Sequence, residues 1–329
     1  MVLEHQARIA TRPLALRDID VPTPGPAEIL VRVAVCGVCR TDLHVIEGDL
    51  APHLLPLVPG HQVVGRVAAC GAGASRFQPG DRVGIAWLRG TCGSCTFCRE
   101  GRENLCDLSH YTGWDAHGGY ADFAIVHERF AYAIPAAFSD TEAAPLLCAG
   151  IIGYRALRRA RVMPGQRLGL YGFGSSAHIV AQIARHRGCD LYVATRDPAH
   201  RRLAEDLGAV WTGDTLDTPP VPLDGAIVFA PAGEVVPPAL RALGKGGTVA
   251  LAGIHMSDLP PMSYDACLFH EKTLTSVESN TRADGEELFR EAAAIPLRPR
   301  VTTFGLTEAN DALLTLARDG IRGTAVLVA

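Results

Sequence analysis

Four cysteines stand close together in the first half of the chain. They fall within fifteen residues, at Cys92, Cys95, Cys98 and Cys106. Four thiolates at this spacing satisfy the tetrahedral coordination of zinc and leave no open position, which is typical of a structural site. Three glycines of the same stretch allow a tight loop, at Gly90, Gly93 and Gly101. The pattern predicts a structural zinc; disulfides, free thiols and a nucleic-acid-binding zinc ribbon are the alternatives.

A second stretch with chemical potential is CGVCRTDLH, residues 36–44, which holds two cysteines, a threonine, an aspartate and a histidine. These residue types suit a redox pair, part of a metal site or part of a buried strand. A catalytic zinc needs fewer protein ligands than a structural one, because one position stays open. Candidate ligands for such a site are Cys39, His61 and Cys148. They are spread along the chain, so their spacing alone does not select them.

A glycine-rich turn follows the apolar run RLGLY. Gly172, Gly174 and Ala177 form the pattern G-x-G-x-x-A directly before a helical segment that begins with Ser175 and Ser176. The first glycine allows a tight turn, the second lets the backbone approach a pyrophosphate, and the third small residue lets helix and strand pack closely. The pyrophosphate then lies at the positive end of a helix. The turn predicts a dinucleotide site; a βα turn without a ligand is the alternative.

The end of the next strand, VATRD, bears on the choice of dinucleotide. An acidic residue about 20 positions after the glycines favours NAD, because it binds the ribose hydroxyls. Here Thr195 occupies the strand end and Arg196 follows it. Both can donate hydrogen bonds to a 2′-phosphate, and His200 and Arg201 add positive charge. The sequence favours NADP(H) over NAD(H); alternatively, Arg196 is merely solvated and Asp197 supplies the acid.

The bulk composition argues against several classes of protein. The 329 residues are 48% hydrophobic and 20% charged, which is ordinary for a globular enzyme of about two domains. The net charge of −4 argues against nucleic acid as a partner. No apolar stretch approaches the roughly 20 residues that cross a bilayer, and the charged N-terminal segment has no signal-peptide core. We expect a cytoplasmic protein, in which clustered cysteines indicate metal or catalysis.

Two regions with different patterns must position these residues. Residues 1 to about 145 contain short apolar runs bounded by Gly and Pro, such as EILVRVAVCGV and DRVGIAW, which indicate strands. From about 165 onward, apolar runs alternate with helical segments, as in GQRLGLYGFG followed by SSAHIVAQIARHRG. This alternation predicts βαβ units and a parallel sheet. The segment after about 295 reads as strand, helix and strand.

Taken together, the motifs resemble the zinc-dependent alcohol dehydrogenases of the medium-chain dehydrogenase/reductase superfamily. The resemblance covers essentially the whole chain, through CGVCRTDLH, PGHQVVG, the four-cysteine lobe, LLCAGIIGY, GFGSSA and the terminal IRG. LGLYGFGSSAH and LAGIHMSD look closest to the cinnamyl-alcohol-dehydrogenase-like branch. The resemblance implies an α/β protein with a Rossmann domain (a doubly wound parallel sheet) and a β-rich, partly barrel-like (GroES-like) catalytic domain. The catalytic domain would comprise 1–146 and 296–329, and the cofactor domain 147–295.

The family pattern places a catalytic zinc on Cys39, His61 and Cys148. It implies that Thr41 hydrogen-bonds the alcohol, and that His44 passes the proton to solvent by way of the nicotinamide ribose. The pattern thus gives the stretch 36–44 a catalytic function.

Further roles follow from the same resemblance. Asp42 would orient the imidazole of His61, while Arg40 and Arg322 would contact the cofactor pyrophosphate. Cys36 has no role in the family, and we interpret it as a buried strand residue rather than half of a redox pair.

One position departs from the family pattern. Where the family usually has Gly-His-Glu, this chain has Gly60-His61-Gln62. An uncharged amide is a poor zinc ligand, so the departure favours three protein ligands, and we expect activity to be retained.

The resemblance also implies a substrate pocket lined by Trp87 and Trp114, although simple core packing is the alternative for each tryptophan. Aromatic walls suit flat apolar alcohols and aldehydes. The predicted function is reversible oxidoreduction of a primary alcohol and its aldehyde with NADP(H) and two zinc ions. The alternatives are an NAD-linked short-chain primary alcohol dehydrogenase and a zinc-stabilised binding protein. Relatives are dimers or tetramers, so we expect a homo-oligomer, and the segment 273–277 could pair across a two-fold axis.

Overall fold

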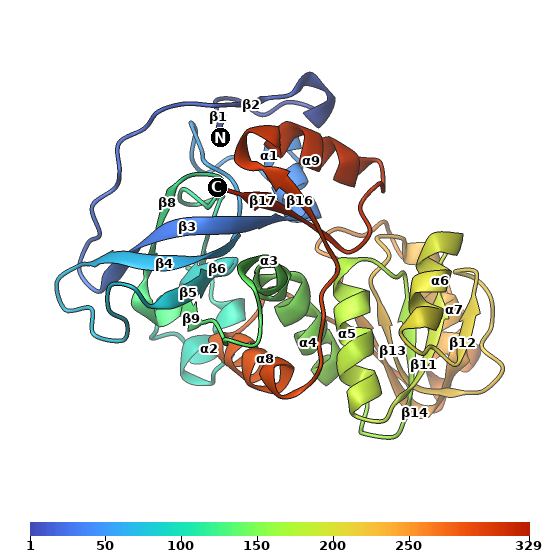
Figure 1. Ribbon diagram of the computed structural model, residues 1–329. Coiled ribbons are helices and arrows are strands. Elements are labelled where there is room, and N and C mark those ends of the chain that lie inside the picture. Colours follow the sequence, from blue (N-terminus) through green and yellow to red (C-terminus); the bar gives the residue numbers. More distant parts are fainter. The chain divides into compact units, whose positions relative to one another are not determined.

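The computed structural model describes all residues, 1–329, and the chain forms two compact units. Unit 1 comprises Met1–Cys148, Ser279–Ala293 and Arg298–Ala329. Unit 2 comprises Ala149–Glu278 and Ala294–Leu297. Figure 1 labels most of the elements of the two units. None of the helices combines the length and the apolar character that crossing a membrane requires.

Unit 2 is built on one six-stranded sheet in which every neighbouring pair of strands is parallel. The strand order is β12-β11-β10-β13-β14-β15, which is the order 3-2-1-4-5-6 of a doubly wound Rossmann sheet. The strands are β10 (Arg167–Tyr171), β11 (Asp190–Ala194), β12 (Trp211–Gly213), β13 (Leu223–Val228), β14 (Leu243–Leu251) and β15 (Thr273–Ser276). The helices are α4 (Ala149–Arg159), α5 (Ser175–His186), α6 (Pro198–Asp206) and α7 (Val236–Ala242).

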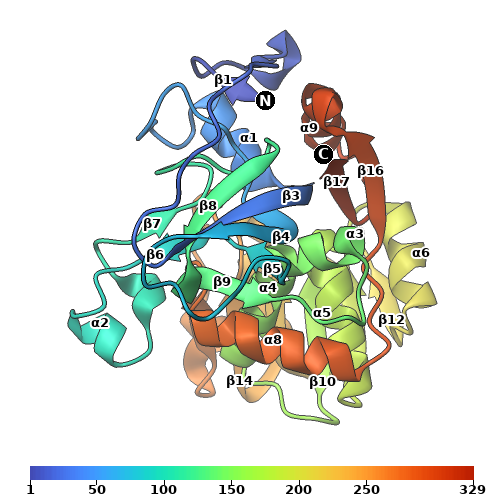
Figure 2. The ribbon, with the colours of Figure 1, turned by 60° about the vertical axis from the view of Figure 1, so that its left-hand side comes forward.

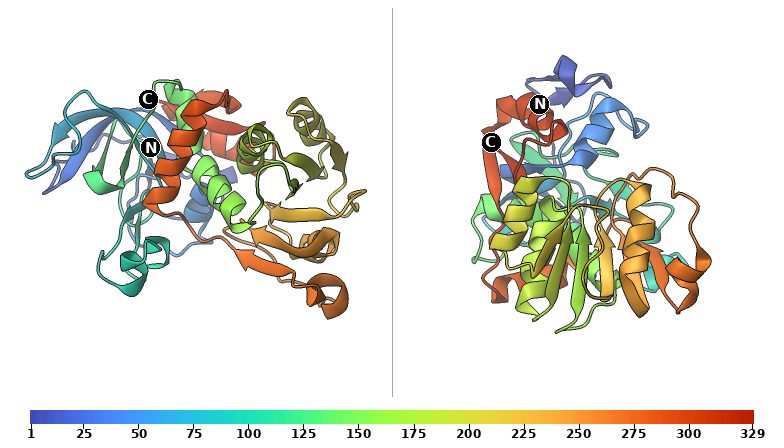
Figure 3. Two further views of the ribbon diagram at one scale, coloured as in Figure 1. Left: turned by 90° about the horizontal axis from the view of Figure 1, so that it is seen from below. Right: turned by 90° about the vertical axis from the view of Figure 1, so that its right-hand side faces the viewer.

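The central strands of unit 2 are buried because helices cover both faces of the sheet. The right-hand view in Figure 3 shows the strands with helices on either side. Strand β10 accordingly has four consecutive buried residues after its first, and so reads as a continuous apolar run. The alternation predicted from the sequence is therefore confirmed, and β15 is an edge strand.

Unit 1 is organised around a seven-stranded sheet in which nearly all pairs are antiparallel. The order is β16-β17-β3-β4-β5-β9, and β8 also pairs with β3. These strands are β3 (Glu28–Val38), β4 (Gln62–Cys70), β5 (Arg82–Ile85), β8 (Phe123–His127), β9 (Ala131–Ala133), β16 (Val301–Gly305) and β17 (Thr324–Val328). The helices of this unit are α1 (Arg40–Glu47), α2 (Thr96–Arg99), α3 (Asp140–Ala143), α9 (Ala309–Ala317) and most of α8 (Arg282–Ala294). Two short pairs complete the strands: β1 (Val2–Leu3) with β2 (Leu14–Ala15), and β6 (Leu88–Gly90) with β7 (His110–Tyr111).

Strand β3 is the centre of unit 1, because it pairs with β4, β8 and β17. Cys36 lies in this strand with 1% of its surface exposed, and it forms no disulfide. The structure thus agrees with the interpretation of Cys36 as a buried strand residue. The residues that end the strand lead directly into α1, so the strand fixes where that helix starts.

Helix α8 lies in unit 1, whereas the sequence-based range 147–295 assigned it to the cofactor domain. The side chain of Phe289 packs on Tyr132 of β9, with 5.9 Å between ring centroids. A Cβ atom at Gly285 would lie 2.4 Å from the same Tyr132 ring, so the helix approaches β9 closely. Arg282, at the start of α8, pairs with Glu103 at 3.1 Å. These contacts explain why unit 1 takes Ser279–Ala293.

Candidate zinc and dinucleotide sites

Cys39 stands at the junction of β3 and α1 and starts the helix. Its extended backbone (φ −138°, ψ 177°) precedes α1, and its sulfur accepts a hydrogen bond from the backbone N–H of Thr41 at 3.3 Å. The Asp42 carboxylate accepts in turn from the backbone N–H of Cys39 at 2.9 Å. This reciprocal capping satisfies amides that the first turn of a helix leaves free. The cap therefore fixes the sulfur of Cys39 and the carboxylate of Asp42 on the same side of the turn.

The three candidate ligands of the catalytic zinc come together in unit 1. The Cys39 sulfur lies 3.3 Å from Nε2 of His61 and 3.9 Å from the sulfur of Cys148. All three donor atoms lie within 4.8 Å of one another. His61 precedes β4 and Cys148 follows the short helical turn Ala144–Leu147, so the fold brings together residues from three distant segments.

The second nitrogen of His61 is held by a buried acid. Nδ1 of His61 lies 2.9 Å from Oδ1 of Asp42, and the hydroxyl of Tyr120 donates to Oδ2 of Asp42 at 3.2 Å. A metal-binding histidine typically donates its other ring nitrogen to a carboxylate, which fixes the ring and raises its basicity. The arrangement directs Nε2 of His61 toward the two cysteines.

The acid–base properties of these three donors are strongly coupled. The hydrogen bond from Cys148 and the charge of His61 hold the pKa of Cys39 well below its usual value, although burial opposes them. The same hydrogen bond, together with burial, raises the pKa of Cys148. Burial alone would lower the pKa of His61, but Cys39 and Asp42 raise it well above its usual value. A thiolate, a second thiol and an imidazole form the Cys₂His set that suits a catalytic zinc with one open position.

The second group of donors lies in the lobe around α2, which projects from the strands of unit 1 in Figure 2. The sulfurs of Cys92, Cys95, Cys98 and Cys106 all lie within 4.8 Å of one another. Gly93 and Gly101 have positive φ angles of 71° and 69°, as the tight loop requires. Four clustered thiols without an open position fit a structural zinc.

The thiols of this lobe differ in acidity. Backbone N–H groups of Ser94 and Cys95 donate to the sulfur of Cys92 and lower its pKa to about 6. A backbone hydrogen bond from Cys98 favours the thiolate of Cys95, but desolvation and neighbouring thiols outweigh it and raise the Cys95 pKa to about 11. One thiolate is therefore available near neutral pH to begin metal binding.

Trp87 lies directly beside one of the candidate donors of the catalytic zinc. Its ring meets that of His61 edge-on, with 5.0 Å between centroids and an interplanar angle of 73°. Trp87 also stacks on Tyr111 at 4.9 Å and runs nearly parallel to Trp114 at 6.0 Å. We call Trp87, Tyr111 and Trp114 the aromatic array. All three side chains are partly exposed, so they are not sealed in a core.

The glycine-rich turn of unit 2 has the geometry of a dinucleotide-binding turn. Gly172 follows β10 with φ 86°, and a Cβ atom there would lie 2.9 Å from the backbone nitrogen of Ala230. Gly174 precedes α5 and no side chain caps this helix end. A Cβ atom at Gly174 would meet nothing within 4 Å, which leaves room above the helix terminus for a phosphate group. Ala177 is fully buried against the sheet, as close packing of helix and strand requires.

Residues after β11 carry the groups expected to meet the adenosine ribose. Thr195 is buried and Arg196 is exposed. Asp197 is engaged in capping α6, where its carboxylate accepts from the backbone N–H of Ala199 at 2.7 Å. His200 lies 4.0 Å from Asp197, and Arg201 donates to the backbone carbonyl of Arg196 at 3.0 Å. The only acid of this turn thus has a local structural partner.

Other expected site residues lie on α1 and near the end of the chain. Thr41 is buried and His44 is partly exposed; Nδ1 of His44 lies 2.7 Å from the carboxylate of Asp49. Arg40 pairs with Asp319. Arg322 is exposed. The structure thus gives Thr41 and His44 a common helix face, three residues apart.

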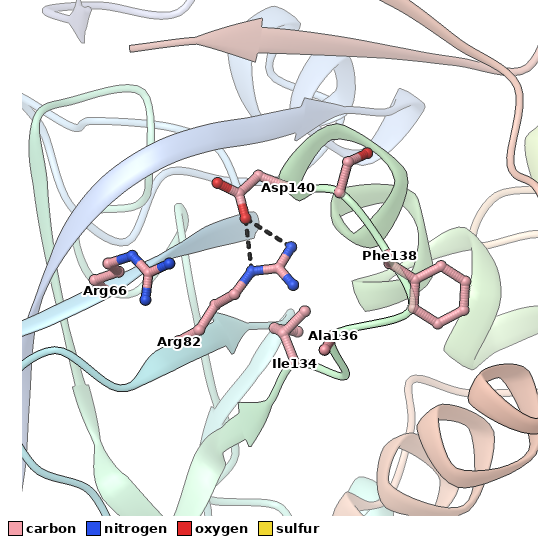
Figure 4. Close-up of a pocket in the computed structure, with 7 residues that line it drawn as sticks. Arg66, Arg82, Ile134, Ala136, Phe138 and Asp140 are labelled. Atoms are coloured by element: carbon pink, nitrogen blue, oxygen red, sulfur yellow. Dashed lines mark hydrogen bonds and ion pairs between the residues drawn. The ribbon is translucent and has the colours of Figure 1, made fainter.

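A separate hollow of unit 1 contains none of these residues. Figure 4 shows it lined by Arg66, Arg82, Ile134, Ala136, Phe138, Ser139 and Asp140. Arg82 donates to Asp140 at 2.7 Å and to the backbone carbonyl of Pro135 at 3.2 Å. The ion pair fastens β5 to α3, and we assign it a structural role.

The structure adds functional neighbours that sequence reasoning did not identify. Tyr120 donates to Asp42, Asp49 pairs with His44, and Tyr111 completes the aromatic array. Of these, only Asp49 carried a local signal, because it stands five residues after His44 on the same short segment. Tyr120 is distant in sequence from Asp42. Tyr111 lies three residues before Trp114, but no motif marks its contact with Trp87.

Comparisons with known proteins show the family to which the chain belongs. Residues 25–136 match the family described as "Alcohol dehydrogenase GroES-like domain", and residues 177–294 match "Zinc-binding dehydrogenase". The chain is 54% identical over 323 residues to "Probable alcohol dehydrogenase AdhA" of Mycobacterium tuberculosis, covering 97% of this chain and 93% of that protein. It is 31% identical to "Probable cinnamyl alcohol dehydrogenase 3" of Oryza sativa, covering 96% and 90% of the two chains.

A solved structure of similar fold is that of a cinnamyl alcohol dehydrogenase from Sorghum bicolor. It superposes with a TM-score of 0.89 at 28% identity and covers 98% of this chain and 96% of that one. The chain therefore belongs to the zinc-dependent alcohol dehydrogenases of the medium-chain dehydrogenase/reductase superfamily. It is an alcohol dehydrogenase with a GroES-like and a Rossmann domain, as the sequence motifs indicated, and its relatives include cinnamyl alcohol dehydrogenases.

Proposed function

We propose that this alcohol dehydrogenase interconverts a primary alcohol and its aldehyde. The proposed substrates are aromatic, or of medium size and apolar. The proposed cofactor is NADP(H) in preference to NAD(H). The observation that carries the substrate proposal is the edge-on contact of Trp87 with His61, 5.0 Å between centroids. It brings the aromatic array next to the donors of the catalytic zinc. A flat apolar substrate gains more from such a wall than a short alkyl chain does.

Different residues of this chain are proposed to hold the metal, orient its ligands and carry the proton. When bound, zinc supplies a Lewis acid to the substrate oxygen and the nicotinamide accepts or returns the hydride. Cys39, His61 and Cys148 hold the metal, and Asp42 keeps the ring of His61 in place. Thr41 hydrogen-bonds the alcohol and receives its proton in oxidation.

His44 completes the proposed passage of that proton. It lies three residues after Thr41 on α1, and its ring is held by Asp49 at 2.7 Å. The exposed carboxylate of Asp49 orients the ring of His44, and His44 releases the proton to solvent. Arg40 and Arg322 are proposed to bind the cofactor pyrophosphate.

The NADP(H) preference rests on the turn after β11. Thr195 stands where a carboxylate would favour NAD, and Arg196 offers an exposed guanidinium for a 2′-phosphate. Asp197, the acid that could have favoured NAD, caps α6 instead. The homo-oligomeric state, the use of the β15 edge across a two-fold axis and the cytoplasmic location remain predictions.

The experiment is a comparison of initial rates with NADPH and NADH, using cinnamaldehyde and benzaldehyde as substrates and a zinc-replete preparation. We expect a clear preference for NADPH. Arg196→Ala should lower kcat/KM for NADPH roughly 10- to 100-fold, the loss expected for a charged hydrogen bond, and should change NADH little. Arg202→Ala, which removes an exposed arginine of α6, is the matched control.

The outcomes separate the parts of the proposal. Equal or better rates with NADH would overturn the cofactor preference and leave the enzyme class intact. Rates with short alkyl aldehydes that exceed those with aromatic aldehydes would overturn the substrate class and favour the short-chain alternative.

A further inference from the structure

His53 covers the outer end of the aromatic array. Its ring stacks on Trp114, with 4.0 Å between centroids and an interplanar angle of 20°. Because Trp114 runs nearly parallel to Trp87, and Trp87 meets His61, the rings form a continuous series from a proposed zinc donor to an exposed histidine. Nothing in the family pattern assigns a role to His53.

The imidazole of His53 is fixed rather than free. Its Nδ1 lies 2.5 Å from Oδ1 of Asp115, and the side chain of Asp115 is only 13% exposed. The other carboxylate oxygen of Asp115 accepts from the backbone N–H of Tyr111 at 2.7 Å. Asp115 therefore ties the histidine to a member of the aromatic array through a single carboxylate.

Trp114 is also held by the segment that carries His53. The indole N–H donates to the backbone carbonyl of Ala51 at 2.8 Å. Residues 51–56 form no helix, strand or β-bridge, so side-chain contacts such as this one help to fix their position. Stacking on His53 and the bond to Ala51 together restrict the ring plane of Trp114.

We infer that His53 is a specificity-determining positioning residue, which with Asp115 holds Trp114 parallel to Trp87 and so favours flat conjugated aldehydes over saturated ones. The inference rests on the proposed function, because it concerns the substrate choice of the same site. Loss of the imidazole exposes part of Trp114 and removes one of the contacts that restrict its ring plane. If the ring of Trp114 no longer stays parallel to that of Trp87, the aromatic array binds a planar substrate less favourably. Its apolar surface remains, so a saturated substrate is affected less.

The first test is the ratio of kcat/KM for cinnamaldehyde to that for hexanal. We expect His53→Ala to lower this ratio roughly three- to tenfold, the size of an aromatic stacking contribution, mainly through KM for cinnamaldehyde. His53→Phe keeps a ring on Trp114 without the ion pair and should restore most of the ratio. His270→Ala, at an exposed histidine of unit 2, is the control and should leave the ratio unchanged.

A second readout does not depend on catalysis. The chain has three tryptophans, and acrylamide quenching of their fluorescence reports how accessible they are. His53→Ala should increase quenching, and the increase should disappear when the same substitution is made in a Trp114→Phe background. The position of Trp114 is thereby tested even where no aldehyde is turned over.

Each outcome has a defined meaning. A folded His53→Ala protein with an unchanged ratio would overturn the inference, as would an equal fall with both aldehydes. Unchanged quenching would overturn the positioning of Trp114. If the parent enzyme turned over neither aldehyde, the proposed function and the substrate selectivity would fail, while quenching would still decide whether His53 holds Trp114. If His53→Ala did not fold, His53→Gln, which keeps a polar partner for Asp115 but removes the ring from Trp114, would take its place, with the same fall of the ratio expected.

Discussion

Nδ1 of His61 lies 2.9 Å from Oδ1 of Asp42, and the two side chains are only 1% and 3% exposed. A buried acid behind a metal-binding imidazole sets the ring orientation and strengthens the ligand. The same carboxylate caps α1 through the backbone N–H of Cys39. One aspartate thus positions two of the three proposed zinc donors.

Replacement of Asp42 should therefore weaken metal binding at this site alone. We expect Asp42→Asn to lower the affinity for the catalytic zinc about 10- to 100-fold, the usual cost of losing such a partner. The measurement is competition with a chromophoric chelator, which resolves the two zinc sites by affinity. Asp18→Asn, at an exposed aspartate, should behave as the parent. An unchanged affinity in Asp42→Asn would show that Asp42 does not support the metal.

Tyr120 should contribute to stability through its bond to Asp42. Tyr120→Phe removes the hydroxyl that donates at 3.2 Å and leaves the ring packing in place. The free energy of unfolding should fall by about 1 kcal/mol, because a buried acceptor loses one of its partners. Urea unfolding measures it, with the exposed Tyr264→Phe as control. Equal stability of the parent and Tyr120→Phe would remove Tyr120 from the network around the zinc donors.

The thiols of the structural lobe should react with alkylating reagents in a defined order once zinc is removed. The pKa of Cys92 is about 6 and that of Cys95 about 11. Since the thiolate is the reactive form, Cys92 should be alkylated first at pH 7, and its rate should fall as pH is lowered through 6. Mass spectrometry after short exposure to iodoacetamide identifies the modified cysteine. Faster reaction at Cys95, or zinc-loaded protein that is not protected, would contradict this assignment.

We expect Gln62 to destabilise the folded protein and not to bind the zinc. It is fully buried, and neither its amide oxygen nor its amide nitrogen has a hydrogen-bond partner. Gln62→Met should raise the free energy of unfolding by about 1 kcal/mol, since unsatisfied buried polar groups cost about 1–3 kcal/mol. Gln62→Glu should lower it, because it buries a charge without a partner.

The control for both variants is Gln78→Met, at an exposed glutamine. Urea unfolding of the zinc-loaded protein gives the free energies, and chelator competition gives the zinc affinity. A Gln62→Glu variant that held its catalytic zinc more tightly than the parent would contradict a site of three protein donors.

The parts of the fold that the sequence predicts are those with local signals. Consecutive apolar and amphipathic segments indicate the alternation of strands and helices from β10 to β14. The short spacing of the four cysteines indicates the structural zinc cluster. The position of α8 was not predictable in this way. Its sequence indicates a helix, but Tyr132, on which it packs, lies about 150 residues earlier in the chain. Hydrophobic periodicity indicates which face of a helix is buried, but not which residue packs against it.

The residues of the candidate site also differ in whether a sequence motif marks them. Cys39, His61 and Cys148 were singled out through family motifs, because residues from three distant segments meet only in the folded chain. The contacts of Tyr120 with Asp42 and of His53 with Asp115 carry no motif at all. They became visible only when distances between side chains were known.

The central claim is that the chain has one catalytic and one structural zinc site. The most direct test is the zinc content per chain of the parent, Cys148→Ser and Cys98→Ser. Atomic emission on dialysed protein measures the zinc, and aldehyde turnover is measured on the same preparations. The two donor groups predict two zinc ions in the parent. Cys148→Ser should retain one zinc, in the structural lobe, and lose turnover. Cys98→Ser should lose the structural zinc and be less stable. A parent with no tightly bound zinc, or a Cys148→Ser protein with full zinc content and full turnover, would contradict the assignment of Cys39, His61 and Cys148 as the catalytic metal site.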